Sequence, residues 1–304
     1  MISESFFQPM GFSLRLLSNS PAIVSAATAS FGRFGPAAPT DAPDLTFRLF
    51  AHALEEPSPG SPTYRPDGDL VYQTTGVSTL LADRGRGLAY GYFSPQVLAN
   101  PAYFRWHFLE LAFFVMLARR GLMGVHGAAI ARNGRAILLR APSGGGKTTL
   151  AYAATRHRFQ ALAEDVVWLD FAEERWWGTP WHFHLLPDAK KLFPELAGHE
   201  PVLQINQECK LEVDLEQLRA GSTTVSARPG PIVLVQRTPG QPSRLEPLPL
   251  PSARSLWLAA QTGAELAYPD YHRHLDALLD DNAYRLTSGD DFESSLDLLE
   301  TLIA

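Results

Sequence analysis

The chain has 304 residues, a formal net charge of −6, a pI of about 5.8, 45% hydrophobic residues and 19% charged residues. This composition is typical of a folded globular protein with one large domain or one medium domain with a smaller partner, and its acidic balance does not suggest the basic face that nucleic-acid binding requires. The single cysteine, Cys209, excludes an internal disulfide and favours a reducing compartment. Residues 1–10 lack the basic start and apolar core of a signal peptide, and the longest apolar run, 111–118, is shorter than the roughly 20 residues that span a bilayer. We therefore expect a cytoplasmic protein with no nucleic-acid partner and no membrane association.

The first hundred residues predict a small, mostly antiparallel β region. Four stretches read as strands: 12–17, 45–50, 69–73 and 87–92. Four prolines and two glycines within 55–68 indicate a surface loop. Asn100 and Pro101 mark a boundary, so we place the two regions at 1–100 and 101–304. The nearly all-apolar stretch 102–120 predicts a buried helix at the start of the second region.

Residues 140–150 read Arg-Ala-Pro-Ser-Gly-Gly-Gly-Lys-Thr-Thr-Leu and carry the strongest motif of the chain. From Ala141 the spacing is that of a phosphate-binding loop with Ala in place of the usual first Gly. The glycines let several backbone N–H groups converge on one phosphate, Lys147 can reach the outer phosphates, and the hydroxyl of Thr148 suits a magnesium ion. The run before the loop predicts a strand and the run after it a helix, whose N-terminus favours an anion. The predicted nucleotide-binding residues are Ala141, Pro142, Ser143, Gly144, Gly145, Gly146, Lys147, Thr148 and Thr149.

Two apolar runs on either side of 133–134, an Asn-Gly dipeptide, predict a β-hairpin just before the loop. A two-residue turn sets the register, so that paired residue numbers add up to 267. By this register His126 lies opposite Ala141, the first position of the phosphate loop. The pattern leaves open whether His126 serves the bound phosphate or packs in the sheet with backbone hydrogen bonds.

Two acidic positions compete for the second nucleotide motif. A short buried strand over 159–163 ends in Glu164 and Asp165, and the next apolar run, 166–169, ends in Asp170. An acid at the end of a strand beside a phosphate loop is where magnesium and the attacking hydroxyl or water are managed. Spacing alone leaves open which position is functional and which is a turn carboxylate.

Together these motifs resemble the HPr kinase/phosphorylase family and the kinases related to it. The likeness lies in His126 and the glycine after it, the Asn-Gly turn, the loop that ends Gly-Lys-Thr, and the pair Glu164 and Asp165. Spacing is the specific feature, because His126 precedes Lys147 by 21 residues and Asp165 follows it by 18. The segment 178–186 is also similar to one that precedes a short helix in these relatives.

The resemblance implies an α/β fold: a P-loop kinase domain of the HPr kinase/PEP carboxykinase-like type, after a smaller, mostly β N-terminal region. It implies ATP and Mg²⁺ as cofactors, with Lys147 and Thr148 holding the outer phosphates and the metal. Asp165 would take the proton from the substrate hydroxyl, with Glu164 beside it in the metal shell. His126 would lie close to the transferred phosphoryl group. The resemblance thus favours the first acid pair over the later acid.

The chain departs from the protein-phosphorylating members in two respects. Glu164 stands where those members have Asp, and the downstream signature with which they engage HPr is not found. The resemblance is therefore to the shorter, HPr-related kinases, and we expect the acceptor to be a serine of a peptide or protein or a small hydroxyl compound. It also suggests a PqqD-like peptide-binding partner and is compatible with a homo-oligomer. Glu208 and Glu212 are candidates for a second metal carboxylate, or exposed charges of a strand.

The rest of the chain predicts further elements without naming a substrate: a buried strand over 232–236 and helices over 252–263, 271–280 and 290–303. The cluster Trp176, Trp177 and Trp181 either lines a substrate groove or belongs to the core.

Two other classes of protein are alternatives to a kinase. One is a nucleotide-binding regulatory or scaffold protein without transferase activity. The other is a motor or transport ATPase, which would need a long domain with a signature helix motif and a second acid-glutamate pair after the loop. Neither feature is found, which leaves the regulatory or scaffold protein as the alternative. From the motifs and the resemblance we expect a phosphotransferase with an alcohol group as acceptor.

Overall fold

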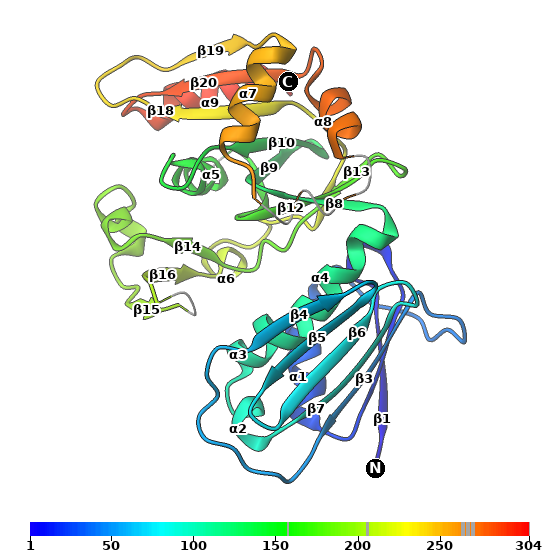
Figure 1. The fold of residues 1–304 in the computed structure, drawn as a ribbon. Helices are drawn as coiled ribbons and strands as arrows, with labels where there is room; N and C mark the ends of the chain where they lie inside the picture. The colour runs from blue at the N-terminus through cyan, green and yellow to red at the C-terminus, as the bar shows by residue number, and fades with distance from the viewer. Residues whose placement is uncertain (157, 205–206, 263–264, 266–267, 269–270, 304) are drawn as a thin grey trace. The chain divides into compact units, whose positions relative to one another are not determined.

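The computed structural model describes residues 1–156, 158–204, 207–262, 265, 268 and 271–303. The chain divides into two compact units, Met1–Arg120 and Gly121–Ala304 (Figure 1). Among the described helices, none combines the length and the apolar character needed to cross a membrane.

The first unit is built on a seven-stranded sheet in the order β1-β2-β3-β7-β6-β5-β4. Strand β3 is parallel to both of its neighbours, whereas the remaining pairs are antiparallel. All four predicted strands form. The strands are β1 (Ser3–Phe7), β2 (Leu14–Ser18), β3 (Leu45–Ala51), β4 (Thr63–Asp67), β5 (Leu70–Thr75), β6 (Ser78–Asp83) and β7 (Leu88–Phe93). Strand β4 lies in the stretch expected to be a surface loop, and its residues are all exposed.

Helices cover one face of this sheet. They are η1 (Pro9–Gly11), α1 (Pro21–Phe31), η2 (Gly32–Phe34), α2 (Pro95–Leu98), α3 (Pro101–Phe104), the π-helical η3 (Arg105–Glu110), α4 (Leu111–Leu117) and η4 (Ala118–Arg120). The predicted helix 102–120 therefore forms as a chain of short segments. Its apolar side packs on α1 and β6, so it belongs to the first unit, and the division falls after Arg120 rather than near residue 100.

The second unit contains a six-stranded mixed sheet in the order β11-β9-β10-β18-β20-β19. Strands β10, β18 and β20 run parallel, and the other neighbours are antiparallel. The strands are β9 (Ala128–Arg132), β10 (Arg135–Arg140), β11 (Gln160–Ala163), β18 (Ile232–Arg237), β19 (Arg244–Pro247) and β20 (Ala283–Ser288). Asn133 and Gly134 both have positive φ angles, 54° and 74°, as a tight β9-β10 turn requires.

Two smaller sheets complete the second unit. One has the order β17-β13-β12-β8 and the other β14-β16-β15. Their strands are β8 (Leu122–His126), β12 (Val166–Asp170), β13 (Arg175–Trp177), β14 (Phe183–Leu185), β15 (Pro201–Leu203), β16 (Cys209–Val213) and β17 (Ser226–Ala227). The helices of the unit are α5 (Lys147–Thr155), η5 (Pro187–Lys191), η6 (Pro194–Leu196), α6 (Leu215–Leu218), α7 (Leu250–Ala259), α8 (Tyr271–Leu279) and α9 (Phe292–Glu300). Residue 263, the predicted end of one helix, lies outside the described residues.

Successive side chains of β10 alternate between two cores. Ile137 and Leu139 pack with α5 and α9 on one face of the sheet, whereas Ala136 and Leu138 pack on the other with α7, α8 and the sheet that contains β8. Arg140, the last residue of β10, points to the same face of the sheet as Ala136 and Leu138. The alternation therefore directs a charged side chain to the apolar α7-α8 side, and its whole side chain is buried there.

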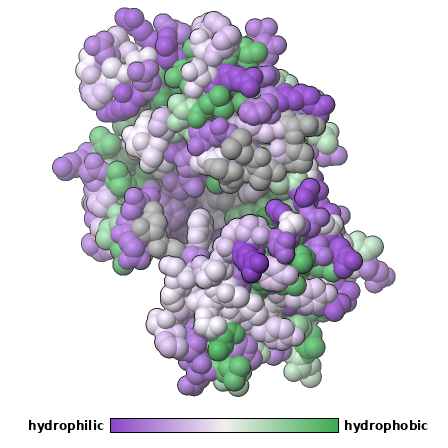
Figure 2. Space-filling model, in the orientation of Figure 1, coloured by the Kyte–Doolittle hydropathy of each residue, from purple (hydrophilic) through white to green (hydrophobic). Residues whose placement is uncertain are grey.

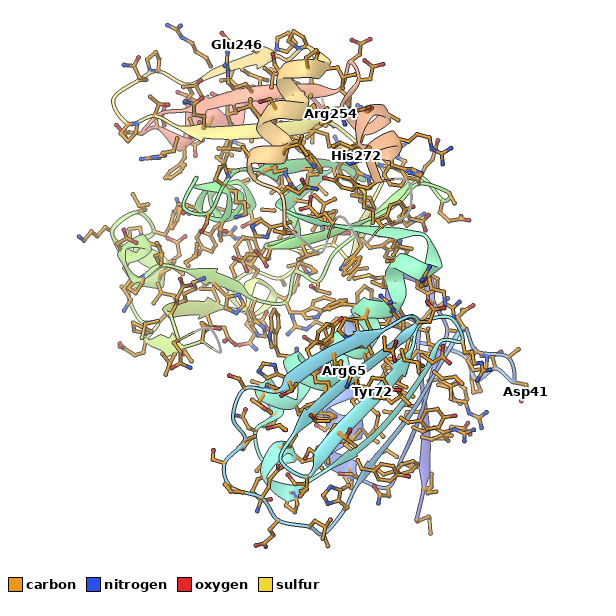
Figure 3. The ribbon with its side chains drawn as sticks, in the orientation of Figure 1. Asp41, Arg65, Tyr72, Glu246, Arg254 and His272 are labelled. Atoms are coloured by element: carbon orange, nitrogen blue, oxygen red, sulfur yellow. The ribbon has the colours of Figure 1, made fainter. Side chains whose placement is uncertain are left out.

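Helices α7 and α8 lie against each other. Arg254 on α7 donates two hydrogen bonds of 2.9 Å to Asp276 on α8 and lies beside His272 (Figure 3). On the face drawn in Figure 2, hydrophilic residues cover most of the surface and hydrophobic ones form separate patches. The three tryptophans near Pro180 divide between core and surface: Trp176 and Trp181 are buried, whereas Trp177 is partly exposed.

Candidate functional site

The phosphate loop joins β10 to α5, as its spacing predicts. Gly144 and Gly146 have φ angles of +76° and +84°, which L side chains rarely adopt. Gly145 is held by a hydrogen bond from its N–H to the carbonyl of Pro142, 3.0 Å long. A Cβ atom on Gly145 would lie 2.6 Å from the Cβ of Ala141, so the loop needs glycine there for close packing. The loop forms an open backbone cradle at the N-terminus of a helix, where N–H groups favour an anion.

Lys147 begins α5 and is buried to 8% exposure. Burial lowers the pKa of its ammonium group, and the negative charges of Asp165 and Glu164 only partly oppose this effect. Among the described residues, no carboxylate forms an ion pair with Lys147 within 4.0 Å. A buried ammonium group without a close counter-ion fits an anionic ligand such as a phosphate.

Asp165 follows β11 and is held from the side of β8. Gly127 donates its backbone N–H to the carbonyl of Asp165 at 2.8 Å, and Nδ1 of His126 lies 3.1 Å from a carboxylate oxygen of Asp165. Desolvation works to raise the pKa of Asp165, but the hydrogen bond and charge of His126, with the charge of Lys147, lower it below its ordinary value. The side chain still keeps 57% of its surface exposed, so the carboxylate is accessible from solvent.

The structure corrects the predicted position of His126. The hairpin register holds between β9 and β10, where paired residue numbers do add up to 267. The chain leaves this sheet at Gly127, where a Cβ atom would lie 2.9 Å from the carbonyl oxygen of Leu139. His126 is therefore not opposite Ala141; it ends β8, in a different sheet, and pairs there with the first residue of β12. The imidazole lies beside the acid pair because of this change of sheet.

Glu164 faces the small sheet that contains β14 and β16. His184 of β14 places Nδ1 at 3.0 Å from Glu164 and Nε2 at 4.0 Å from Glu212 of β16. Burial works to lower the pKa of His184, but the hydrogen bond with Glu164 and the charges of both glutamates raise it above its ordinary value. Of the two downstream glutamates, Glu212 thus lies on this side of the site, whereas Glu208 pairs with Lys210 at 2.8 Å. Sequence reasoning assigned no role to His184, although it lies in the segment 178–186.

The residues present fit a magnesium ion that is bound together with a nucleotide, but not one held by the protein alone. Among the described residues, no group of three or more His, Cys, Asp or Glu side chains is arranged to hold a metal ion. Mg²⁺ bound with a nucleotide needs no such group, because one or two carboxylates and the substrate phosphates are its usual ligands. Thr148 on the first turn of α5 and Glu164 supply a hydroxyl and a carboxylate of this kind, and His184 orients the carboxylate.

Asp170 serves a different part of the unit. It ends β12 at the opposite end from the His126 pairing and accepts backbone hydrogen bonds from Ala172 and Glu173 at 3.1 and 3.0 Å. It also lines a cavity of about 740 Å³, together with Arg135, at the start of the strand that leads to the loop. Asp170 is therefore a turn carboxylate in this structure.

No protein-family model matches the chain, and no curated protein matches it. Among solved structures, the Hpr(Ser) kinase/phosphatase from Coxiella burnetii is similar with 12% sequence identity and a TM-score of 0.29, over 59% of this chain and 93% of that one. This is a distant structural likeness. It assigns no role to any residue of the site.

Proposed function

We propose that the chain is an ATP-dependent kinase that transfers the γ-phosphate of Mg-ATP to a hydroxyl group, either of a serine in a peptide or protein or of a small compound. The observation that carries the proposal is the convergence of three groups from separate elements. His126 from β8 contacts Asp165 after β11, and the charges of Asp165 and its neighbour Glu164 act on the buried Lys147 at the start of α5. Phosphoryl transfer asks a protein mainly for positioning and charge stabilisation, and these groups supply both.

The backbone of residues 141–149 would bind the phosphates, with Lys147 at the outer ones. Asp165 would accept the proton of the acceptor hydroxyl. At the same time the oxygen of that hydroxyl would bond to the γ-phosphorus, and the bond from the γ-phosphorus to the β-γ bridging oxygen would break, releasing ADP. The lowered pKa of Asp165 keeps the carboxylate ionised at neutral pH. Thr148 and Glu164 would hold Mg²⁺, which neutralises charge on the phosphates when bound.

The test is mass spectrometry of the purified protein with Mg-ATP and a pool of acceptors that includes free serine and serine-bearing peptides. Asp165→Asn is run beside it, because an amide keeps the size of the side chain but cannot take the proton. We expect an acceptor that gains one phosphate with the wild-type protein and not with the variant. Equal transfer by Asp165→Asn would refute the role of the base. ATP binding without ADP or phosphorylated product would favour a nucleotide-binding regulatory protein instead.

A further inference from the structure

A fully buried ion pair lies directly behind the phosphate loop. Arg140, the residue before the loop, and Glu265 have side chains that are 0% and 1% exposed. Two guanidinium nitrogens donate to the two carboxylate oxygens at 2.9 and 3.0 Å. The pair therefore has the bidentate geometry that makes charge-assisted hydrogen bonds strong and directional.

Neighbouring groups satisfy the rest of this pair. The guanidinium group lies 4.0 Å from the ring centroid of Trp257 and donates two longer hydrogen bonds to the carbonyl of the same residue. Tyr271 donates its hydroxyl to Glu265 at 3.2 Å and accepts the indole N–H at 2.8 Å. Burial first, and then the negative charge of Glu265, raise the pKa of the Tyr271 hydroxyl to about 12. The pair is thus fixed from both α7 and α8.

Both members of the pair also bind the backbone of His126. Glu265 accepts the N–H of His126 at 3.1 Å, and Arg140 donates to its carbonyl at 2.9 Å. The ion pair thereby binds both the backbone N–H and the carbonyl of His126, the residue whose imidazole reaches Asp165. Both bonds restrain rotation of the backbone segment that carries the imidazole.

A buried ion pair is weak evidence for stability, since well-packed apolar side chains in the same place are often as stable. Apolar side chains could not, however, bind the N–H and carbonyl of His126. We infer that Arg140 and Glu265 are positioning residues, which hold the His126 imidazole against Asp165 in the geometry needed for phosphoryl transfer. The inference rests on the proposed function for its catalytic consequence, but not for its structural part.

The test uses the paired variant Arg140→Met with Glu265→Leu, which fills the space without an unpaired charge and removes both bonds to His126. A matched control is Arg254→Met with Asp276→Leu, which deletes the half-exposed arginine-carboxylate pair between the same two helices. The first readout is the Nδ1-bound proton of His126 in histidine-labelled protein by NMR, without ATP. An ionised carboxylate accepts at this nitrogen, so Nδ1 carries the proton. The signal is assigned by its loss in His126→Gln.

We expect exchange of this proton with water to become about tenfold faster, or the signal to vanish, in the paired variant and to stay unchanged in the control. The second readout is steady-state kinetics with the acceptor that the mass-spectrometric test identifies. Here kcat should fall about tenfold to a hundredfold, with KM for ATP unchanged. A purely structural pair would leave a folded variant with the wild-type signal and kcat, and that result would overturn the inference.

If the paired variant does not fold, Arg140→Lys decides the matter. A lysine keeps the charge that Glu265 needs, but its single nitrogen cannot span both carboxylate oxygens and the His126 carbonyl. An unchanged His126 signal in that variant would refute the inference, and a weakened one would support it. If the His126 signal changes in the variants but the wild-type protein transfers no phosphate, the proposed function is refuted and the structural part of the inference stands. Wild-type transfer with an insensitive signal would refute the positioning role alone.

Discussion

Removing one partner of the buried Arg140-Glu265 pair should destabilise the second unit more than removing both. In the wild-type chain Arg140 is 0% exposed, and in Glu265→Leu its acceptors among the described residues would be only the carbonyls of His126 and Trp257. A buried charge left without its partner costs about 3–5 kcal/mol. For a unit of this size, each kcal/mol corresponds to about 2–4 °C, so the melting temperature should fall by about 6–20 °C. Arg140→Met should cost a similar amount, because it leaves the carboxylate unpaired.

The paired variant should recover most of this loss. Leu and Met are close in volume to the Glu265 and Arg140 side chains that they replace. A methionine sulfur in the place of the guanidinium also makes a favourable contact with the Trp257 ring. We expect the paired variant to lie within about 1–2 kcal/mol of the wild type. The coupling free energy between the two sites would then amount to about 4–9 kcal/mol.

Urea unfolding followed by tryptophan fluorescence measures this cycle. Five of the six tryptophans lie in the second unit, with Trp106 alone in the first, so the fluorescence transition reports mainly the unit that carries the pair. Circular dichroism, which senses both units, checks whether they unfold together. Additive effects of the two single variants, or a loss below about 1 kcal/mol in each, would refute the reasoning.

Two of three further predictions concern the site itself, and the third concerns close backbone packing on β11. Lys147→Met should weaken ATP binding at least about tenfold, measured by calorimetry, without loss of thermal stability, because burial disfavours the ammonium in the folded state; a protein that binds ATP as before would contradict the role of this lysine. His126→Ala should move the acid limb of the pH-rate profile to higher pH. The reason is that His126 lowers the pKa of Asp165, and the base stops working as pH falls through that pKa; an unmoved limb would argue against the contact. Gly178→Ala should cost about 1–3 kcal/mol in urea unfolding, because its Cβ would lie 1.8 Å from the carbonyl oxygen of Leu162. Gly198→Ala, which meets nothing within 4 Å, is the control and should be nearly neutral.

Local features could be predicted from the sequence because they depend on neighbouring residues. The order strand, glycine-rich loop, helix follows from spacing around residues 141–149, and the β9-β10 register follows from a two-residue turn that an Asn-Gly pair adopts easily. The early helix α1 was missed, since its small residues resemble the proline- and alanine-rich loop after it and its apolar side is defined only by the sheet it covers.

A charged residue at the end of an otherwise apolar strand was the available signal for the buried pair. Alternation along β10 directs Arg140 to a core face, and a buried arginine needs an acceptor. Sequence could not name that acceptor, because Glu265 lies 125 residues away. The same holds for His184, whose partner Glu164 is 20 residues earlier on another element.

The sequence by itself therefore determined the glycine-rich loop over 141–149 and the elements on either side of it. The tertiary structure decided what surrounds the loop, above all the position of His126. One glycine without a Cβ lets the chain pass close to the carbonyl of Leu139 and change sheets. Contacts from Arg140 of β10 and from Glu265, before α8, then hold the end of β8 where its imidazole reaches Asp165. Such an arrangement depends on packing between distant segments, which no local pattern encodes.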